Sequence, residues 1–281
     1  MRAWLAVFVC LAALSAAAVS AHATTTPPSV LVIGDSVATG MFWHDDAIAV
    51  MQKNLGVHWE VAVCRTIGGM SCPFDGERPP TLLQVVAALG VVPPTVVVVV
   101  GYNDPTPTFP SEVDAAMSAL SAAGARNVIW LTLREARAPY RLFNAVLAQA
   151  QERWPQLVLV DWNAASESHP TWFQNDDVHL TRLGGLAMAH LAHGAVVRIF
   201  NPLHVPATPL WLPPGRPHAM RLRAAGGTPP YRWRVAAGRP PPGFHLLANG
   251  TLTTEAGRRA SVLVEVTDAD GSTADMQVLE R

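Results

Sequence analysis

The sequence predicts an α/β protein, in which a three-layer domain with a parallel sheet is followed by a small all-β sandwich. Between residues 29 and 200, short apolar runs alternate with helix-like stretches, which is typical of a parallel sheet covered by helices on both faces. After residue 200, prolines come in quick succession, and short alternating segments separated by turn signals replace the helical pattern. We therefore expect an α/β domain over 29–200 and a proline-rich linker with a β-sandwich over 201–281.

Five apolar runs are expected to form the parallel sheet. The run over 95–100 contains five consecutive valines and predicts a central strand, because such strands are buried on both faces. The other four strands are expected over residues 30–33, 57–64, 127–133 and 157–161.

Helices are expected around these strands, over residues 45–55, 81–89, 111–123, 140–153 and 181–197. Ser111 is expected to cap the third helix, and Gly124 is expected to end it. In sheets of this kind ligands bind beyond the carboxyl ends of the strands, so functional residues are expected there.

The first 23 residues have the pattern of a signal peptide. Arg2 supplies a positive charge, residues 5–19 are almost wholly apolar or small, and Ala21-His22-Ala23 fits a cleavage site. Residues 24–28 then form a loose mature N-terminus. A single membrane anchor is the alternative, although the apolar stretch is short for a span. We expect no transmembrane span in the mature protein, which would be secreted, periplasmic or held at the cell surface.

Composition narrows the class of partner. The formal net charge is −1 and the sequence contains no basic run, which argues against a protein that binds nucleic acid. Half of the residues are apolar, enough for a substantial core. A small or neutral partner is expected.

The three cysteines predict one disulfide. Cys10 falls within the signal peptide, and Cys64 and Cys72 remain as a pair separated by a short loop. In an oxidising compartment such a pair is expected to be bonded. A zinc site or a catalytic thiol, the alternatives, would require further cysteines or a histidine close to them.

Three polar sites together indicate nucleophilic catalysis. Ser36, Asn103 and His179 are each expected at the carboxyl end of a strand. A serine hydroxyl needs a base to take its proton, and the base needs a carboxylate to hold its tautomer. The reaction also needs donors for the oxyanion. Each residue alone is typical of a turn or a cap, and only their order along the chain favours an active site.

This arrangement resembles the SGNH hydrolase superfamily, also called GDSL-like lipases or esterases. Gly34-Asp35-Ser36 matches its first block, Gly101-Tyr102-Asn103-Asp104 its third, and Asp176-Asp177-Val178-His179 its fifth. The resemblance covers the domain over 29–200 and implies a flavodoxin-like fold. The α/β-hydrolase alternative lacks its G-x-S-x-G motif, because Val37-Ala38 follows the serine.

The resemblance implies roles for the matching residues. Ser36 would be the nucleophile, His179 the base and Asp176 the carboxylate behind it, with no metal and no organic cofactor. The oxyanion hole would combine Asn103 with the backbone N–H groups of Ser36 and of a glycine. The second block matches least well, since an arginine, a threonine and an isoleucine precede its glycines. Counting from the strand end favours Gly69 over Gly68.

Several neighbouring residues are expected to have structural roles. Asp35 and Asp104 are expected to fix their turns, and Asp177 is expected to point away from the site on an extended segment. His190 and His193 are expected on the surface or in the core of a helix, with binding of a metal ion as the alternative. Trp162, Trp172 and Phe173 are expected to pack in the core, with the lining of a pocket for an acyl or sugar group as the alternative.

The C-terminal part resembles the immunoglobulin-like (cadherin-like) modules of bacterial surface proteins. The matching segments are residues 226–233, 242–246, 249–252 and 264–268. This resemblance implies a fold and an extracellular setting, but no chemistry.

We therefore expect an exported serine esterase that acts on acetyl or short acyl esters. Its substrate would be a small-molecule or carbohydrate ester, and the C-terminal domain would contact cell-surface polymer. An acyltransferase with the same residues, or a non-catalytic surface glycan-binding protein, is the alternative.

Overall fold

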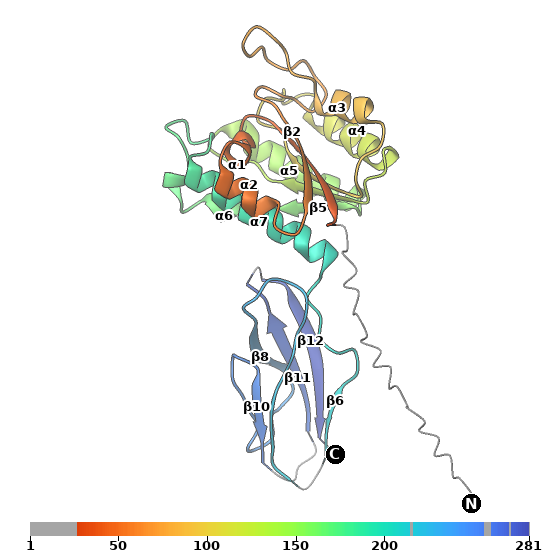
Figure 1. Cartoon of the computed structure of the whole chain (residues 1–281), viewed down its shortest axis with the longest axis vertical. Coiled ribbons are helices and arrows are strands. Elements are labelled where there is room, and N and C mark those ends of the chain that lie inside the picture. Colours follow the sequence, from red (N-terminus) through yellow and green to blue (C-terminus); the bar gives the residue numbers. More distant parts are fainter. Residues whose placement is uncertain (1–26, 214–215, 256–259, 270, 281) are drawn as a thin grey trace, which may run out of the picture.

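The computed structural model describes residues 27–213, 216–255, 260–269 and 271–280. The expected signal peptide, Cys10 within it and residues 24–26 lie outside the described residues. The described chain contains an α/β part followed by a β part (Figure 1). Each part has its own cluster of buried apolar side chains.

The α/β part is built on a parallel sheet, as predicted. Its strands are β1 (Ser29–Gly34), β2 (Gly56–Val61), β3 (Thr95–Val99), β4 (Asn127–Leu131) and β5 (Leu157–Val160), in the order β2-β1-β3-β4-β5. This is the order of a flavodoxin-like doubly wound sheet, whose ligand crevice lies at the switch between β1 and β3. The residues that follow these two strands are therefore placed together.

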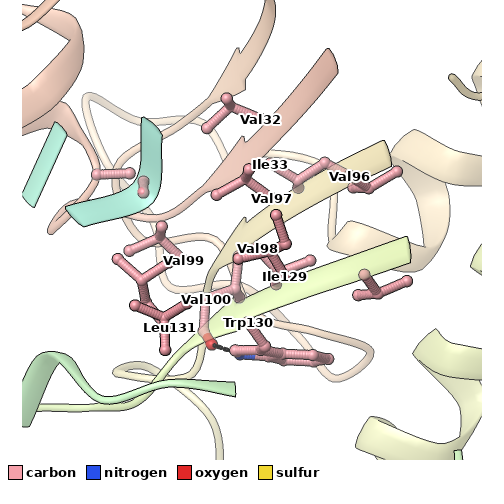
Figure 2. Close-up of a cluster of buried hydrophobic side chains, with 14 of the residues drawn as sticks. Val32, Ile33, Val96, Val97, Val98, Val99, Val100, Ile129, Trp130 and Leu131 are labelled. Atoms are coloured by element: carbon pink, nitrogen blue, oxygen red, sulfur yellow. Dashed lines mark hydrogen bonds between the residues drawn. The ribbon is translucent and has the colours of Figure 1, made fainter. Parts of the chain in front are cut away.

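The valine strand forms the centre of the core. Every residue of β3 is buried, and Val97 lies between Val32 of β1 and Ile129 of β4 in the register of the sheet. Figure 2 shows these aliphatic side chains together with Trp130, whose Nε1 donates to the carbonyl oxygen of Val100 over 3.1 Å. Continuous burial on both faces explains why the strand reads as an unbroken apolar run.

Helices cover both faces of the sheet (Figure 1). One layer contains α1 (Thr39–Phe42), α2 (Asp45–Met51) and α7 (Arg182–Phe200), and the other contains α3 (Leu82–Leu89), α4 (Phe109–Ala122) and α5 (Ala138–Arg153). The short helices α1, α6 (Trp162–Ser166) and η1 (Pro170–Trp172) were not predicted, because they have too few turns for a periodic pattern.

Helix α4 does not begin as predicted. It starts at Phe109 with Thr108 at the N-cap, and Pro110 occupies its first turn, where the missing N–H has no cost. Ser111 is not the cap, since it lies inside the helix and its Oγ donates to the Thr108 carbonyl over 2.9 Å. Gly124, with φ of +110°, follows the end of the helix as predicted.

Two other elements end at least three residues before their predicted ends. Helix α2 ends at Met51 rather than residue 55, and Asn54 has a φ of +61° that is incompatible with a continuing helix. Strand β2 ends at Val61 rather than residue 64, and Cys64 has a φ of +70°. Both differences place a turn where the sequence analysis extended an element.

Helix α7 is long and apolar enough, by length and composition alone, to cross a bilayer. A window of it has a mean hydropathy of 1.3, so apolar content alone does not set this helix apart from a span, and the expectation of no transmembrane span in the mature protein stays a prediction. The helix packs against α1, α2, β4 and β5, as the core helix of a globular domain does.

The β part contains two sheets. One is antiparallel with the order β7-β10-β9, and the other has the order β6-β12-β11-β8 with β6 parallel to β12. The strands are β6 (Leu210–Leu212), β7 (His218–Arg221), β8 (Arg232–Ala237), β9 (His245–Leu246), β10 (Thr251–Thr254), β11 (Ala260–Thr267) and β12 (Thr273–Glu280). Trp233, Leu252 and Val264 belong to one shared core. The immunoglobulin-like resemblance stays a prediction.

Candidate active site

Ser36 lies in the turn between β1 and α1, at the predicted edge of the sheet. The turn is tied to the neighbouring strand, because the Asp35 N–H donates to the carbonyl oxygen of Val99 over 2.9 Å. The Thr39 hydroxyl closes it from the helix side by donating to the Ser36 carbonyl over 2.5 Å. Ser36 is 9% exposed, so its hydroxyl is held in a defined position near the surface.

His179 lies in the loop before α7. The expectation that it directly follows a strand was wrong, because α6 and η1 stand between β5 and this loop. The loop is fixed at both ends: the Gln174 N–H donates to the His179 carbonyl over 2.7 Å, and Thr181 caps α7 by accepting from Gly184 over 3.4 Å.

The structure brings Ser36, His179 and Asp176 together in a chain of hydrogen bonds that we call the relay. His179 Nε2 is 2.9 Å from Ser36 Oγ, and His179 Nδ1 is 2.5 Å from Asp176 Oδ2. Because a carboxylate only accepts, the proton between the latter two belongs to Nδ1, which leaves Nε2 free to accept from the serine. The relay can therefore move the Ser36 hydroxyl proton to His179.

Asp176 is held as a carboxylate. Its Oδ1 accepts the N–H groups of Val178 and His179 over 3.1 and 2.9 Å. Partial burial raises its pKa, but these bonds and the His179 side chain outweigh burial and lower the pKa to about 2. Asp177 has a φ of +60° and lies in a turn, so the expectation of an extended segment at this position was wrong.

Asn103 follows β3 and lies beside the second loop of the site. Its Nδ2 donates to the carbonyl oxygen of Arg65 over 3.1 Å. A side-chain amide has two N–H bonds, so one remains for a ligand. The adjacent Tyr102 is anchored by its hydroxyl, which accepts from the Arg134 N–H over 2.7 Å.

Asp35 joins the serine turn to the Asn103 loop, and it fixes the turn as predicted. Its fully buried carboxylate accepts from Val37 over 2.9 Å and from both Gly101 and Tyr102 over 3.3 Å. Burial raises the pKa of Asp35 to about 6, although the three backbone donors oppose this effect.

The glycine loop (Ile67-Gly68-Gly69) lies between β2 and α3. Asp104 holds it by accepting the Ile67 N–H over 2.8 Å, a bond to a distant loop and not within its own turn as expected. A Cβ atom on Gly68 would lie 3.0 Å from Leu83 Cδ1, and one on Gly69 would lie 3.2 Å from Glu112 Oε1. Within the described part of the chain, neither glycine N–H donates a hydrogen bond. The choice between Gly69 and Gly68 stays a prediction.

The predicted disulfide between Cys64 and Cys72 is present, with an S–S distance of 2.01 Å. Arg65, whose role was not predicted, is only 2% exposed. Its Nε donates to the Pro80 carbonyl over 3.0 Å and its Nη1 to the Glu60 carbonyl, so the side chain pins the loop to two neighbouring segments.

The aromatic residues near the relay mostly pack. Trp162 is fully buried and Phe173 is 5% exposed. Trp172 stacks on the rings of Trp162 and His169, with centroid distances of 5.7 and 3.9 Å. The packing interpretation therefore holds for the first two. Trp172 is half-buried, packs against the core and lies between the rings of Trp162 and His169.

The two helix histidines lie elsewhere. His193 Nε2 contacts the Lys53 carbonyl oxygen over 3.0 Å, and His190 is exposed. Both line a hollow of 840 Å³ between α2, α7 and the β part, which Phe200 and Thr228 also line and to which no relay residue belongs. Among the residues that the structure describes, no three His, Cys, Asp or Glu side chains are grouped to hold a metal ion.

Comparison with known proteins gives only distant likenesses. No protein family and no curated protein matches the sequence. Among solved structures, Est24, a carbohydrate acetylesterase from Sinorhizobium meliloti, is 13% identical with a TM-score of 0.49 over 62% of this chain and all of that chain. A family 3 carbohydrate esterase of Clostridium thermocellum is 14% identical, with a TM-score of 0.39 over 58% of this chain and 92% of that chain. An aryl esterase of M. smegmatis is 12% identical, with a TM-score of 0.42 over 60% of this chain and 98% of that chain. With TM-scores below 0.5, these likenesses carry no conclusion about activity.

Proposed function

We propose that this protein is an exported serine esterase that cleaves carboxylic esters through an acyl-serine intermediate. The observation that carries the proposal is the relay, in which His179 lies within hydrogen-bonding distance of both Ser36 Oγ and the Asp176 carboxylate. Ser36 attacks the ester carbonyl while His179 takes its proton, and His179 then returns that proton to the leaving alcohol. Water, activated by the same histidine, releases the acid.

The oxyanion is received by backbone and side-chain donors. We assign these to the N–H of Ser36, the N–H of Gly69 and the side-chain amide of Asn103. The assignment is supported by the second amide proton of Asn103 and by Gly68 and Gly69, whose N–H groups have no acceptor among the described residues. Aligned donors of this kind stabilise the tetrahedral intermediate more than the ground state.

A fluorophosphonate probe tests the nucleophile directly. We expect wild-type protein to be labelled at Ser36, as located by peptide mass spectrometry, and to hydrolyse p-nitrophenyl acetate. Ser36→Ala should lose both, whereas Ser111→Ala, which alters an exposed serine on α4, should retain both. Wild-type protein that neither reacts with the probe nor turns over the ester would contradict the proposal and favour a non-catalytic protein.

The substrate class that we favour is acetyl or short acyl esters on carbohydrate or cell-wall polymer. Support comes from the resemblance of the C-terminal part to surface modules and from its two sheets around a core of their own. Rates on p-nitrophenyl esters of increasing chain length, together with acetate release from acetylated polysaccharide, test this choice. Formation of an acylated sugar acceptor instead of free acid would identify a transferase.

Export and surface contact are separate parts of the proposal. The leader sequence and the Cys64–Cys72 disulfide support an oxidising destination. The mature protein from a native host should begin at Thr24. Co-sedimentation of full-length Ser36→Ala with insoluble cell-wall polymer tests binding without turnover.

A further inference from the structure

Two carboxyl groups meet behind the glycine loop. Asp104 follows Asn103 at the end of β3, and Glu112 lies in the first turn of α4. Asp104 is 8% exposed, and the outer oxygens Asp104 Oδ2 and Glu112 Oε2 are both buried. Buried acidic groups normally have a cation or several donors beside them.

Both side chains support the glycine loop. Asp104 Oδ1 accepts the Ile67 N–H over 2.8 Å. Glu112 Cγ lies 3.3 Å from the position of a Cβ on Gly68, and its Oε1 lies 3.2 Å from that position on Gly69. The loop therefore rests on the two carboxyl groups, and any movement of Glu112 reaches both glycines.

Two oxygens of the pair, Asp104 Oδ2 and Glu112 Oε2, are buried without a donor among the described residues. The Asp104 side chain nevertheless has Glu112 as its side-chain hydrogen-bond neighbour. Two ionised carboxylates can only accept, so they would repel each other in this place. One proton removes the conflict, because a carboxylic acid donates to the neighbouring carboxylate in a short, strong hydrogen bond.

The surroundings favour retention of that proton. Besides Glu112, the titratable group that raises the pKa of Asp104 is Asp35, which is also acidic. The charge of the Arg65 guanidinium interacts with Asp35 and Glu60. Helix α3, which packs on α4, carries no charged residue. On α4 itself, Asp114 is paired with Arg153 of α5. Burial, with the Glu112 hydrogen bond and charge, raises the pKa of Asp104 to about 8 against the effect of the Ile67 N–H.

We infer that Asp104 and Glu112 share one proton, and that this protonated pair is a positioning element that holds the glycine loop in place to receive the oxyanion. The inference rests on the proposed esterase function. When the proton is lost, two like charges separate α4 from the Asp104 loop and the glycine N–H groups are displaced. Because the oxyanion forms only during the reaction, kcat falls and KM changes little.

The experiment is a pH profile of kcat and KM for wild type and three variants. We expect the kcat of wild type to fall about tenfold or more above about pH 8, in keeping with the loss of one oxyanion donor. In Glu112→Gln and in Asp104→Asn, the amide N–H donates to the remaining carboxylate at every pH, so the alkaline fall should disappear. Asp114→Asn makes the same charge change on α4 at an exposed site and should keep the wild-type profile.

Several outcomes would overturn the inference: an alkaline fall in kcat that persists in Glu112→Gln and Asp104→Asn, the absence of such a fall in wild type, or a rise in KM in place of the fall. If one variant does not fold, the other carries the test. If wild type is inactive, the proposed function fails, and infrared spectra still decide on the shared proton. The C=O stretch of a protonated carboxyl should vanish on raising the pH of wild type and be missing in Glu112→Gln, and its absence from wild type excludes the pair.

Discussion

The relay and the glycine loop are held in place by opposite means. The relay is at the surface, where the side chains of His179 and Asp176 are 42% and 36% exposed, and its acid and base lie three residues apart in one turn. The glycine loop is held from within, by the buried carboxyl of Asp104 and the buried guanidinium of Arg65. The acid–base pair of the relay is organised by local hydrogen bonds, whereas the glycine loop is held by tertiary contacts.

Under the proposed function, this difference separates two kinds of contribution to catalysis. The relay would act through side-chain functional groups, which are lost when a residue is truncated. The glycine loop would act through backbone N–H donors, which no side-chain substitution removes and which can only be shifted in position. We therefore expect changes in the relay to be nearly all-or-none and changes around the loop to be graded.

The largest effect is expected for His179→Ala. Without the base, Ser36 Oγ keeps its proton, and kcat should fall by about 10⁴- to 10⁶-fold, as for other serine–histidine pairs. Initial rates on p-nitrophenyl acetate measure the loss, and circular dichroism checks the fold. His190→Ala removes an exposed histidine of α7 and should keep the wild-type rate. Activity within tenfold of wild type in His179→Ala would show that the relay does not work as a unit.

The same difference decides what could be predicted from the sequence. Asp176 and His179 lie in one turn, and the turn of Ser36 directly follows an apolar strand. A short sequence motif therefore identifies the acid–base pair, and another identifies the serine. The parallel sheet was equally readable, because burial on both faces leaves continuous apolar runs such as that of β3. Local patterns sufficed wherever the geometry itself is local.

The support of the glycine loop could not be predicted in this way. Glu112 reads as an ordinary acidic residue near a helix start, and only the packing of α4 on the loop brings it to Asp104. Arg65 also reads as a surface residue until its contacts with Glu60 and Pro80 are seen. A charged residue that is buried by tertiary contacts produces no repeating pattern in the sequence by which it could be recognised.

A smaller effect is expected for Asn103→Ala, which tests the loop side of the comparison. Loss of the amide removes one oxyanion donor, so kcat should fall by about 10²- to 10³-fold with KM within about twofold. Steady-state kinetics at neutral pH measure both constants. A rise in KM alone would place Asn103 in ground-state binding instead. A loss as large as that of His179→Ala would remove the distinction between the two regions.

Removal of the disulfide is expected to act through stability. The bond closes a loop with a sequence separation of 8, so Cys64→Ser with Cys72→Ser should lower the free energy of unfolding by about 2–3 kcal/mol. Urea unfolding of the double variant and of wild type measures the difference. Thiol titration of denatured wild-type mature protein should find neither cysteine free. Equal stability of the two proteins would mean that Arg65 and Asp104 suffice to hold the loop.

The smallest effect concerns Asp35, which joins the serine turn to the Asn103 loop. Its pKa is raised from an ordinary 3.8 to about 6, so between these values the folded protein keeps a proton that the unfolded chain loses. The free energy of unfolding should therefore fall as the pH rises from about 4 to about 6, by at most about 1.4 kcal/mol per pH unit from this group. Urea unfolding across this range measures the slope.

Two variants separate Asp35 from the other acids. Asp35→Asn cannot titrate, so its slope between pH 4 and 6 should be smaller than that of wild type, whereas Glu112→Gln should keep the part due to Asp35. Asp176, with its pKa lowered to about 2, acts in the opposite sense and only as the pH falls below about 4, where its contribution to stability is lost. An unchanged slope in Asp35→Asn would mean that water reaches this carboxyl, and that the serine turn is less enclosed than the glycine loop.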